Sequence, residues 1–293
     1  MTAVRSTAMI RAERIPPTPL VLGGIGSVQF GAAFAKTLFD DVGPGGAVLL
    51  RVAFAAVILC ALWRPALRGR SAADWRLMLA YGFVLVAMNF TYYESLDRIP
   101  LGIAVTFEFV GPLGVAIAGS RHALDVLWVT LAAAGILLLS NFGTADLDGL
   151  GVALALIAGG FWAAYILLAA RVGQAQPGGQ GLALAMAAGT LMLSPVGVAQ
   201  GGADLLSPSV LGIGAAVAVL SSVIPYTLEL EALRRMPANV FGVLMSLEPA
   251  AASLAGFLVL GQDLVARELV AIGLVVTASA GAARGSRVPP RDA

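Results

Sequence analysis

The chain has 293 residues, of which 59% are hydrophobic and 12% are charged, and its mean hydropathy is +0.89. A water-soluble domain of this size carries about 25% charged residues, so a protein surrounded only by water is excluded. The formal net charge of +1 excludes the basic surplus of a nucleic-acid-binding protein. The single cysteine, Cys60, lies in an apolar run and can form no intrachain disulfide.

Apolar runs that are long enough to cross a bilayer as helices, which takes about 20 residues, follow one another along the whole chain. They cover residues 20–36, 46–63, 77–94, 100–118, 124–142, 149–170, 181–199, 210–232, 238–258 and 266–283. The segments between them are short, glycine- and proline-rich loops, and none could contain a second domain. Residues 20–30 of the first run include three glycines and Gln29, which make a poor signal-peptide core, so we expect this run to be a membrane helix. The sequence therefore predicts an all-α polytopic membrane protein with ten transmembrane helices.

The distribution of arginine predicts the orientation of these helices. If the N-terminus is cytoplasmic, 14 of the 18 Lys and Arg residues fall in cytoplasmic segments, and six aspartates gather on the outer side. Ten spans then place both termini in the cytoplasm, and we expect a bacterial inner membrane. The predicted divisions are a tail (1–19), a first five-helix unit (20–142), a second (149–283) and a C-terminal tail (284–293).

A motif near the middle of the chain returns near its end. Residues 94–100 (ESLDRIP) align with residues 231–237 (EALRRMP) at a shift of 137 positions, and the same shift brings Pro112 onto Pro249. Because each half holds five helices, an odd number, the second half must enter the membrane from the opposite side. The sequence therefore predicts two inverted five-helix repeats, an architecture of secondary transporters that bind substrate near the midplane.

Charged side chains inside the spans need a reason, because each costs about 2.5–3.5 kcal/mol at the bilayer centre on insertion scales. Glu108 and Glu248 lie near the centres of the fourth and ninth spans, although the repeat does not pair the two positions. Each either binds a proton or substrate or is a protonated packing group. Arg51 either extends to the outer surface, neutralises a glutamate or holds a substrate carboxylate. Glu229, inside the eighth span, is a further candidate.

Two prolines lie beside the central glutamates. Pro112 and Pro249 each remove a backbone N–H and free a carbonyl about one turn earlier. Freed carbonyls beside a carboxylate could receive an ammonium group; the alternative is a simple kink.

Aromatic side chains inside the spans could line a central cavity or only pack against lipid and other helices. Residues 30–34 match residues 161–165 weakly at a shift of 131, which places their aromatic side chains at related positions of the repeat. The aromatic candidates are Phe30, Trp162, Tyr165 and Tyr226.

Two further charged pairs look structural. Glu94 and Arg98, like Glu231 and Arg235, are four residues apart just before a proline that starts the next helix. That spacing favours an ion pair that secures a tight turn.

Several of these segments resemble the threonine/homoserine exporter group of the drug/metabolite transporter superfamily, which has two EamA-type domains. The resemblance is carried by residues 99–105, 108–113, 225–229 and 241–250 and extends over nearly the whole chain. It implies ten helices around a central cavity and efflux of small amino acids in exchange for protons.

The leading functional hypothesis is a secondary active exporter of zwitterionic amino acids. A zwitterion needs an acceptor for its ammonium group, Glu108 or Glu248, and a donor for its carboxylate, such as Arg51. Export of cationic or drug-like compounds is the alternative and would not need Arg51. A membrane-embedded enzyme has no support, because the sequence shows neither an Asp-x-x-x-Asp pair nor a His–Glu zinc motif. We expect no cofactor and no metal; the expected partners are the amino-acid substrate, protons and the lipid bilayer.

Overall fold

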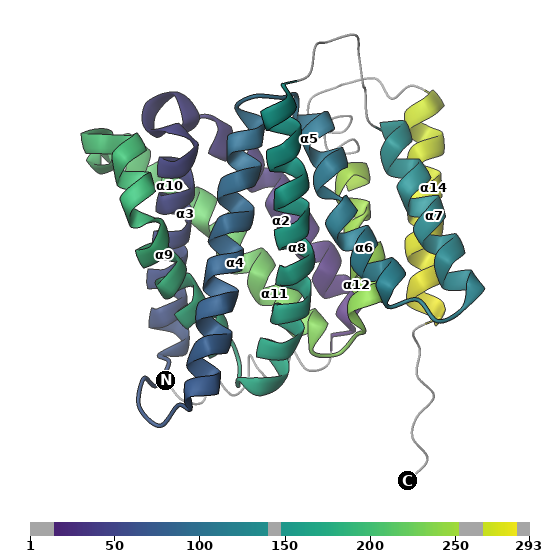
Figure 1. Cartoon of the computed structure of the whole chain (residues 1–293), viewed down its shortest axis with the longest axis horizontal. Coiled ribbons are helices and arrows are strands. Elements are labelled where there is room, and N and C mark those ends of the chain that lie inside the picture. Colours follow the sequence, from purple (N-terminus) through teal and green to yellow (C-terminus); the bar gives the residue numbers. More distant parts are fainter. Residues whose placement is uncertain (1–14, 140–147, 252–265, 286–293) are drawn as a thin grey trace.

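The computed structural model describes residues 15–139, 148–251 and 266–285. Regular structure in these ranges is helical. The helices are α2 (Pro17–Lys36), α3 (Phe39–Trp63), α4 (Ala72–Leu96), α5 (Leu101–Glu108), α6 (Val110–Ala118), α7 (Ala123–Leu139), α8 (Gly149–Ala175), α9 (Gln180–Gly201), η1 (Gly202–Leu206), α10 (Pro208–Ala218), η2 (Val219–Val223), α11 (Ile224–Leu233), α12 (Ala238–Met245) and α14 (Ala266–Gly285). They stand side by side, with α9 and α10 at one edge of the view and α7 and α14 at the other (Figure 1).

Each predicted span coincides with a helix or with a helix that is interrupted once or twice. Residues 140–142 and 252–258, at the ends of the predicted fifth and ninth spans, lie outside the described residues. Within the described ranges, five stretches are long and apolar enough to cross a membrane: Phe39–Trp63, Gly149–Ala175, Gln180–Leu206, Pro208–Leu233 and Ala266–Arg284. The prediction of an all-α protein with membrane-spanning helices is therefore confirmed.

The second span starts earlier than the sequence predicts. Residues 40–46, expected to be a loop, belong to α3, which begins at Phe39. Gly43 interrupts this helix with φ 65° and ψ 170°, a conformation that glycine adopts without steric cost, and Pro44 follows inside the helix. Because α3 extends to Trp63, Arg51 lies at its midpoint and not near its outer end.

Glycines allow close approach of the helix backbones at two crossings. Where α4 meets α9, a Cβ atom on Gly189 would lie 3.0 Å from the carbonyl oxygen of Gly82. Where the α5–α6 break meets α8, a Cβ atom on Gly159 would lie 2.6 Å from the carbonyl oxygen of Glu108. Small residues at such crossings are typical of helices that associate in membranes.

The repeated sequence has the same backbone conformation in both copies. Pro100 (φ −56°, ψ 140°) precedes α5, and Pro237 (φ −63°, ψ 144°) precedes α12. The helices then break at Phe109 (φ −64°, ψ −11°) and at Ser246 (φ −61°, ψ −13°), which are also 137 positions apart. α5 begins near the upper end of the view, whereas α12 begins near the lower end (Figure 1).

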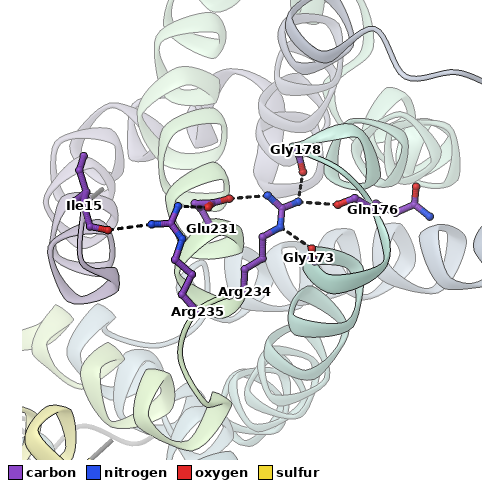
Figure 2. A network of polar contacts seen from close by, with 7 residues as sticks. All are labelled: Ile15, Gly173, Gln176, Gly178, Glu231, Arg234 and Arg235. Carbon is purple, nitrogen blue, oxygen red and sulfur yellow. Dashed lines mark hydrogen bonds and ion pairs between the residues drawn. The ribbon is translucent and has the colours of Figure 1, made fainter. Parts of the chain in front are cut away.

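The ion pairs predicted at the two turns are present. Glu94 accepts a hydrogen bond of 2.7 Å from Arg98, and Glu231 pairs with Arg235 in the same way. Glu231 also binds Arg234, whose Nη1 lies 2.6 Å from its carboxylate (Figure 2). The two ion pairs predicted from this spacing are therefore confirmed.

Candidate functional site around Arg51

Arg51 is buried at the centre of the bundle, with 7% of its surface exposed. Its Nε donates to Ser222 Oγ at 2.7 Å, and its Nη1 donates to the Tyr93 hydroxyl at 3.1 Å. Its Nη2 donates to the Ser221 carbonyl and, at 3.2 Å, to the Tyr226 hydroxyl. The alternative that Arg51 extends to the outer surface is wrong, because the residue is buried and its side chain donates to groups of α4, η2 and α11.

Every acceptor around Arg51 is neutral. Its guanidinium carbon lies 5.9 Å from the ring centroid of Tyr93 and 5.8 Å from that of Tyr226, within the range of cation–π attraction. The ion pairs among the described residues join other side chains, at the two turns. Buried charges are usually paired with an opposite charge, but among the described residues no carboxylate forms an ion pair with Arg51.

The two serines that hold Arg51 come from η2, a π-helical segment between α10 and α11. Pro225, the second residue after it, has no N–H, so the carbonyl of Ser221, four residues earlier, lacks an α-helical donor, and it accepts from Arg51. π-helical segments are frequent at functional sites. The sequence analysis missed Ser221 and Ser222; two adjacent serines before a proline inside an apolar run were the available signal.

A second group of side chains continues from Tyr226. Asn89 Nδ2 donates to the Tyr226 hydroxyl at 2.9 Å, which connects α4 to α11. The ring of Tyr165, from α8, lies 5.4 Å from that of Tyr226, and its hydroxyl donates to Glu229 Oε2 at 2.7 Å. The structure thus brings three of the predicted candidates, Tyr165, Tyr226 and Glu229, into contact next to Arg51.

The two central glutamates belong to the same region. Glu108 ends α5 and is 8% exposed, and Glu248 lies in the helical residues 247–251 that follow the break at Ser246. Their carboxylates interact electrostatically with each other and with Arg51.

The two predicted helix-breaking prolines each follow an observed break by three residues. Pro112 follows the break at Phe109, and Pro249 follows the break at Ser246. Pro112 leaves the carbonyl of Glu108 without a helical donor, and this carbonyl lies against Gly159 of α8.

The remaining aromatic candidates lie near the first break or outside the described side chains. Trp162 is buried and packs edge-to-face against Phe109, with 4.9 Å between the ring centroids. The side chain of Phe30 lies outside the described part of α2. In residues 15–139, 148–251 and 266–285, no group of three or more His, Cys, Asp or Glu is placed to hold a metal ion.

Comparison with known proteins gives consistent matches. The model of the EamA-like transporter family matches residues 149–283. The threonine/homoserine exporter RhtA of Escherichia coli strain K12 is 43% identical to this chain over 268 residues, which cover 90% of each chain. The threonine/homoserine exporter RhtA of Salmonella typhimurium strain LT2 is 41% identical over 278 residues, which cover 94% of each chain. A solved crystal structure that is 17% identical in sequence superposes with a TM-score of 0.77. The match covers 92% of this chain and 97% of the other chain, so the two proteins share the fold. The resemblance found in the sequence is confirmed, and the chain belongs to the EamA-like transporter family.

Proposed function

We propose that this protein is a secondary active exporter of small zwitterionic amino acids such as threonine and homoserine. The names of its relatives support this substrate class. The observation that carries the proposal is Arg51, a buried cation whose hydrogen-bond acceptors are all neutral. Such a site attracts an anion, and a carboxylate is the anionic group that every amino acid provides.

The carboxylates around Arg51 supply the complementary half of the site. Glu108 or Glu248 receives the substrate ammonium group, and the other carboxylate takes the coupling proton. Both interact electrostatically with Arg51, so a bound zwitterion would lie between opposite charges. Tyr165, Tyr226 and Trp162 line this region, and Glu229, which is held by Tyr165, is available as a further acidic group.

We further infer that the chain crosses a bacterial inner membrane ten times as two inverted repeats, with both termini in the cytoplasm. The helix pairs support this. α4 packs on α8, and the pair related to it by the repeat, α11 and α2, also packs together. The corresponding second and seventh spans, α3 and α9, pack on each other, as do the fifth and tenth, α7 and α14.

Export of a cationic or drug-like compound is the competing function. Arg51 argues against it, because a buried guanidinium that no carboxylate contacts repels a cation, and a cationic substrate without a carboxylate has no group that would bind it. Preference for a cation over a zwitterion is the result that would favour this alternative in the experiment that follows.

The substrate class can be tested with the purified protein in proteoliposomes. We expect the wild type to transport threonine and to discriminate strongly against threoninamide, which keeps the ammonium and hydroxyl groups but lacks the carboxylate. Arg51→Gln removes the charge that binds the carboxylate, so its apparent affinity for threonine should fall about 10- to 100-fold, the equivalent of one hydrogen bond to a charged group. Its discrimination between threonine and threoninamide should fall by the same factor. Equal transport of both compounds by the wild type would contradict the proposal.

Proton coupling is tested by the central glutamates. Collapse of an imposed pH gradient should stop uphill threonine transport. Of Glu108→Gln and Glu248→Gln, the variant that loses the proton carrier should keep threonine binding but lose its pH dependence, whereas the other should lose binding itself. Glu94→Gln, at the ion pair with Arg98, is the matched control and should keep the wild-type pH dependence. Wild-type behaviour of both central variants would show that the two glutamates are packing groups.

A further inference from the structure

We propose that the hydroxyls of Tyr93 and Tyr226 occupy the place of the substrate carboxylate on Arg51 while the carrier is empty, and that they thereby permit its return without substrate. This inference rests on the proposed function, in which Arg51 binds the carboxylate. It assigns to the two tyrosines a role in one step of the transport cycle, the reorientation of the empty protein.

The guanidinium of Arg51 has one fixed side and one exchangeable side. Nε binds Ser222 Oγ at 2.7 Å, and Nη2 binds the Ser221 carbonyl, so η2 holds the group in place. Toward the tyrosines the contacts are longer: Nη1 lies 3.1 Å from the Tyr93 hydroxyl, and Nη2 lies 3.2 Å from the Tyr226 hydroxyl. Two oxygens, one on each terminal nitrogen, are also what a carboxylate presents to an arginine.

A phenol hydroxyl is suited to such an exchange, because it can accept or donate a hydrogen bond. In the structure both hydroxyls accept from Arg51. When a carboxylate takes their place, the hydroxyls no longer need to accept from Arg51, and that of Tyr226 can donate to Asn89 Oδ1, 3.4 Å away, so binding of the substrate does not depend on them. Asn89 holds the Tyr226 hydroxyl from the other side at 2.9 Å, so the hydroxyl stays beside Arg51 in either arrangement.

The empty carrier needs these acceptors most when the site is closed to water. An arginine N–H that is buried without a partner carries a large desolvation penalty. In the loaded carrier the substrate carboxylate satisfies Arg51, and in a conformation open to solvent water does so. In the closed empty intermediate only groups of the protein can accept the hydrogen bonds of Arg51. A protein carboxylate in this position would compete with the substrate, whereas a neutral hydroxyl leaves the positive charge available.

The test compares net efflux with exchange in proteoliposomes. Net efflux requires the empty carrier to return, but exchange of labelled for unlabelled threonine requires only the loaded carrier. We expect Tyr93→Phe and Tyr226→Phe to lower the rate of net efflux about 10- to 100-fold, the factor for one hydrogen bond to a charged group, and to change exchange by less than about threefold. Thr91→Val is the matched control. It removes a hydroxyl from α4 two positions before Tyr93, and this hydroxyl donates to the carbonyls of Ala87 and Met88 in its own helix, so both rates should stay unchanged.

The possible results separate this inference from the proposed function. If either phenylalanine variant lowers exchange and net efflux equally, the tyrosines do not act in the empty return step and the inference is wrong. If the wild type transports no amino acid in either assay, the proposed function itself fails. Should a phenylalanine variant not fold, Asn89→Ala provides the second measurement. It releases the Tyr226 hydroxyl without touching Arg51, and an equal loss of both rates in this variant would also overturn the inference.

Discussion

The two copies of the repeated turn, residues 94–100 and 231–237, have the same backbone but different connections to the rest of the bundle. Position 97 is aspartate, whereas the matching position 234 is arginine. The guanidinium of Arg234 reaches the end of α8, where it donates to the carbonyls of Gly173 at 2.6 Å, Gln176 at 2.8 Å and Gly178 (Figure 2). A cation at the C-terminus of a helix binds the carbonyls that have no helical donor.

The first copy is connected through a neutral side chain. Gln200, near the end of α9, donates to Glu94 Oε1 at 2.9 Å and accepts from the backbone N–H of Gly45 in α3 at 2.6 Å. Asp97 is exposed and takes part in none of these contacts. The residues shared by the two copies therefore determine the conformation of the turn, and the residues that differ determine how strongly each turn is attached to its neighbours.

The largest expected difference between the two turns is the side of the membrane on which each one lies. Pro100 and Pro237 are both exposed, both precede a helix and are 137 positions apart, so they make a matched pair. In a Cys60→Ala background, we expect Pro100→Cys to react with a membrane-impermeant maleimide from outside intact cells, and Pro237→Cys to react only after the cytoplasmic side is opened. Labelling of both cysteines from the same side would contradict the inverted arrangement of the two repeats.

The second prediction concerns the strength of the two attachments. Arg234→Ala leaves three carbonyls without their charged donor and Glu231 with Arg235 alone, and it should lower the free energy of unfolding in detergent by about 2–3 kcal/mol, as for hydrogen bonds to a charged group. Gln200→Ala removes a bond to a backbone N–H and an exposed bond to Glu94, which Arg98 still pairs, so it should cost less, about 0.5–1.5 kcal/mol.

Arg234→Lys is the control for charge alone. It keeps the cation but cannot bind several carbonyls at once with a planar group, so it should recover only part of the lost stability. If Arg234→Ala and Gln200→Ala lower the free energy of unfolding equally, as measured by thermal unfolding, the two turns do not differ in how strongly they are attached.

The sequence by itself determined the features that depend on neighbouring residues. Long apolar runs can satisfy their backbone in lipid only as helices, and a spacing of four residues brings Glu94 to Arg98 and Glu231 to Arg235. The shift of 137 also predicted the conformations that recur at Pro100 and Pro237, because similar local sequences favour the same turn.

Only the tertiary structure decided what surrounds Arg51. Its partners come from α4, η2 and α11, between 42 and 175 positions away in the chain, and no local pattern indicates which of several polar groups will face it. The sequence analysis expected carbonyls freed by Pro112 and Pro249 to serve the central site. The freed carbonyl that Arg51 binds belongs to Ser221 and is released by Pro225, because the packing of α3 against η2 brings these two segments together.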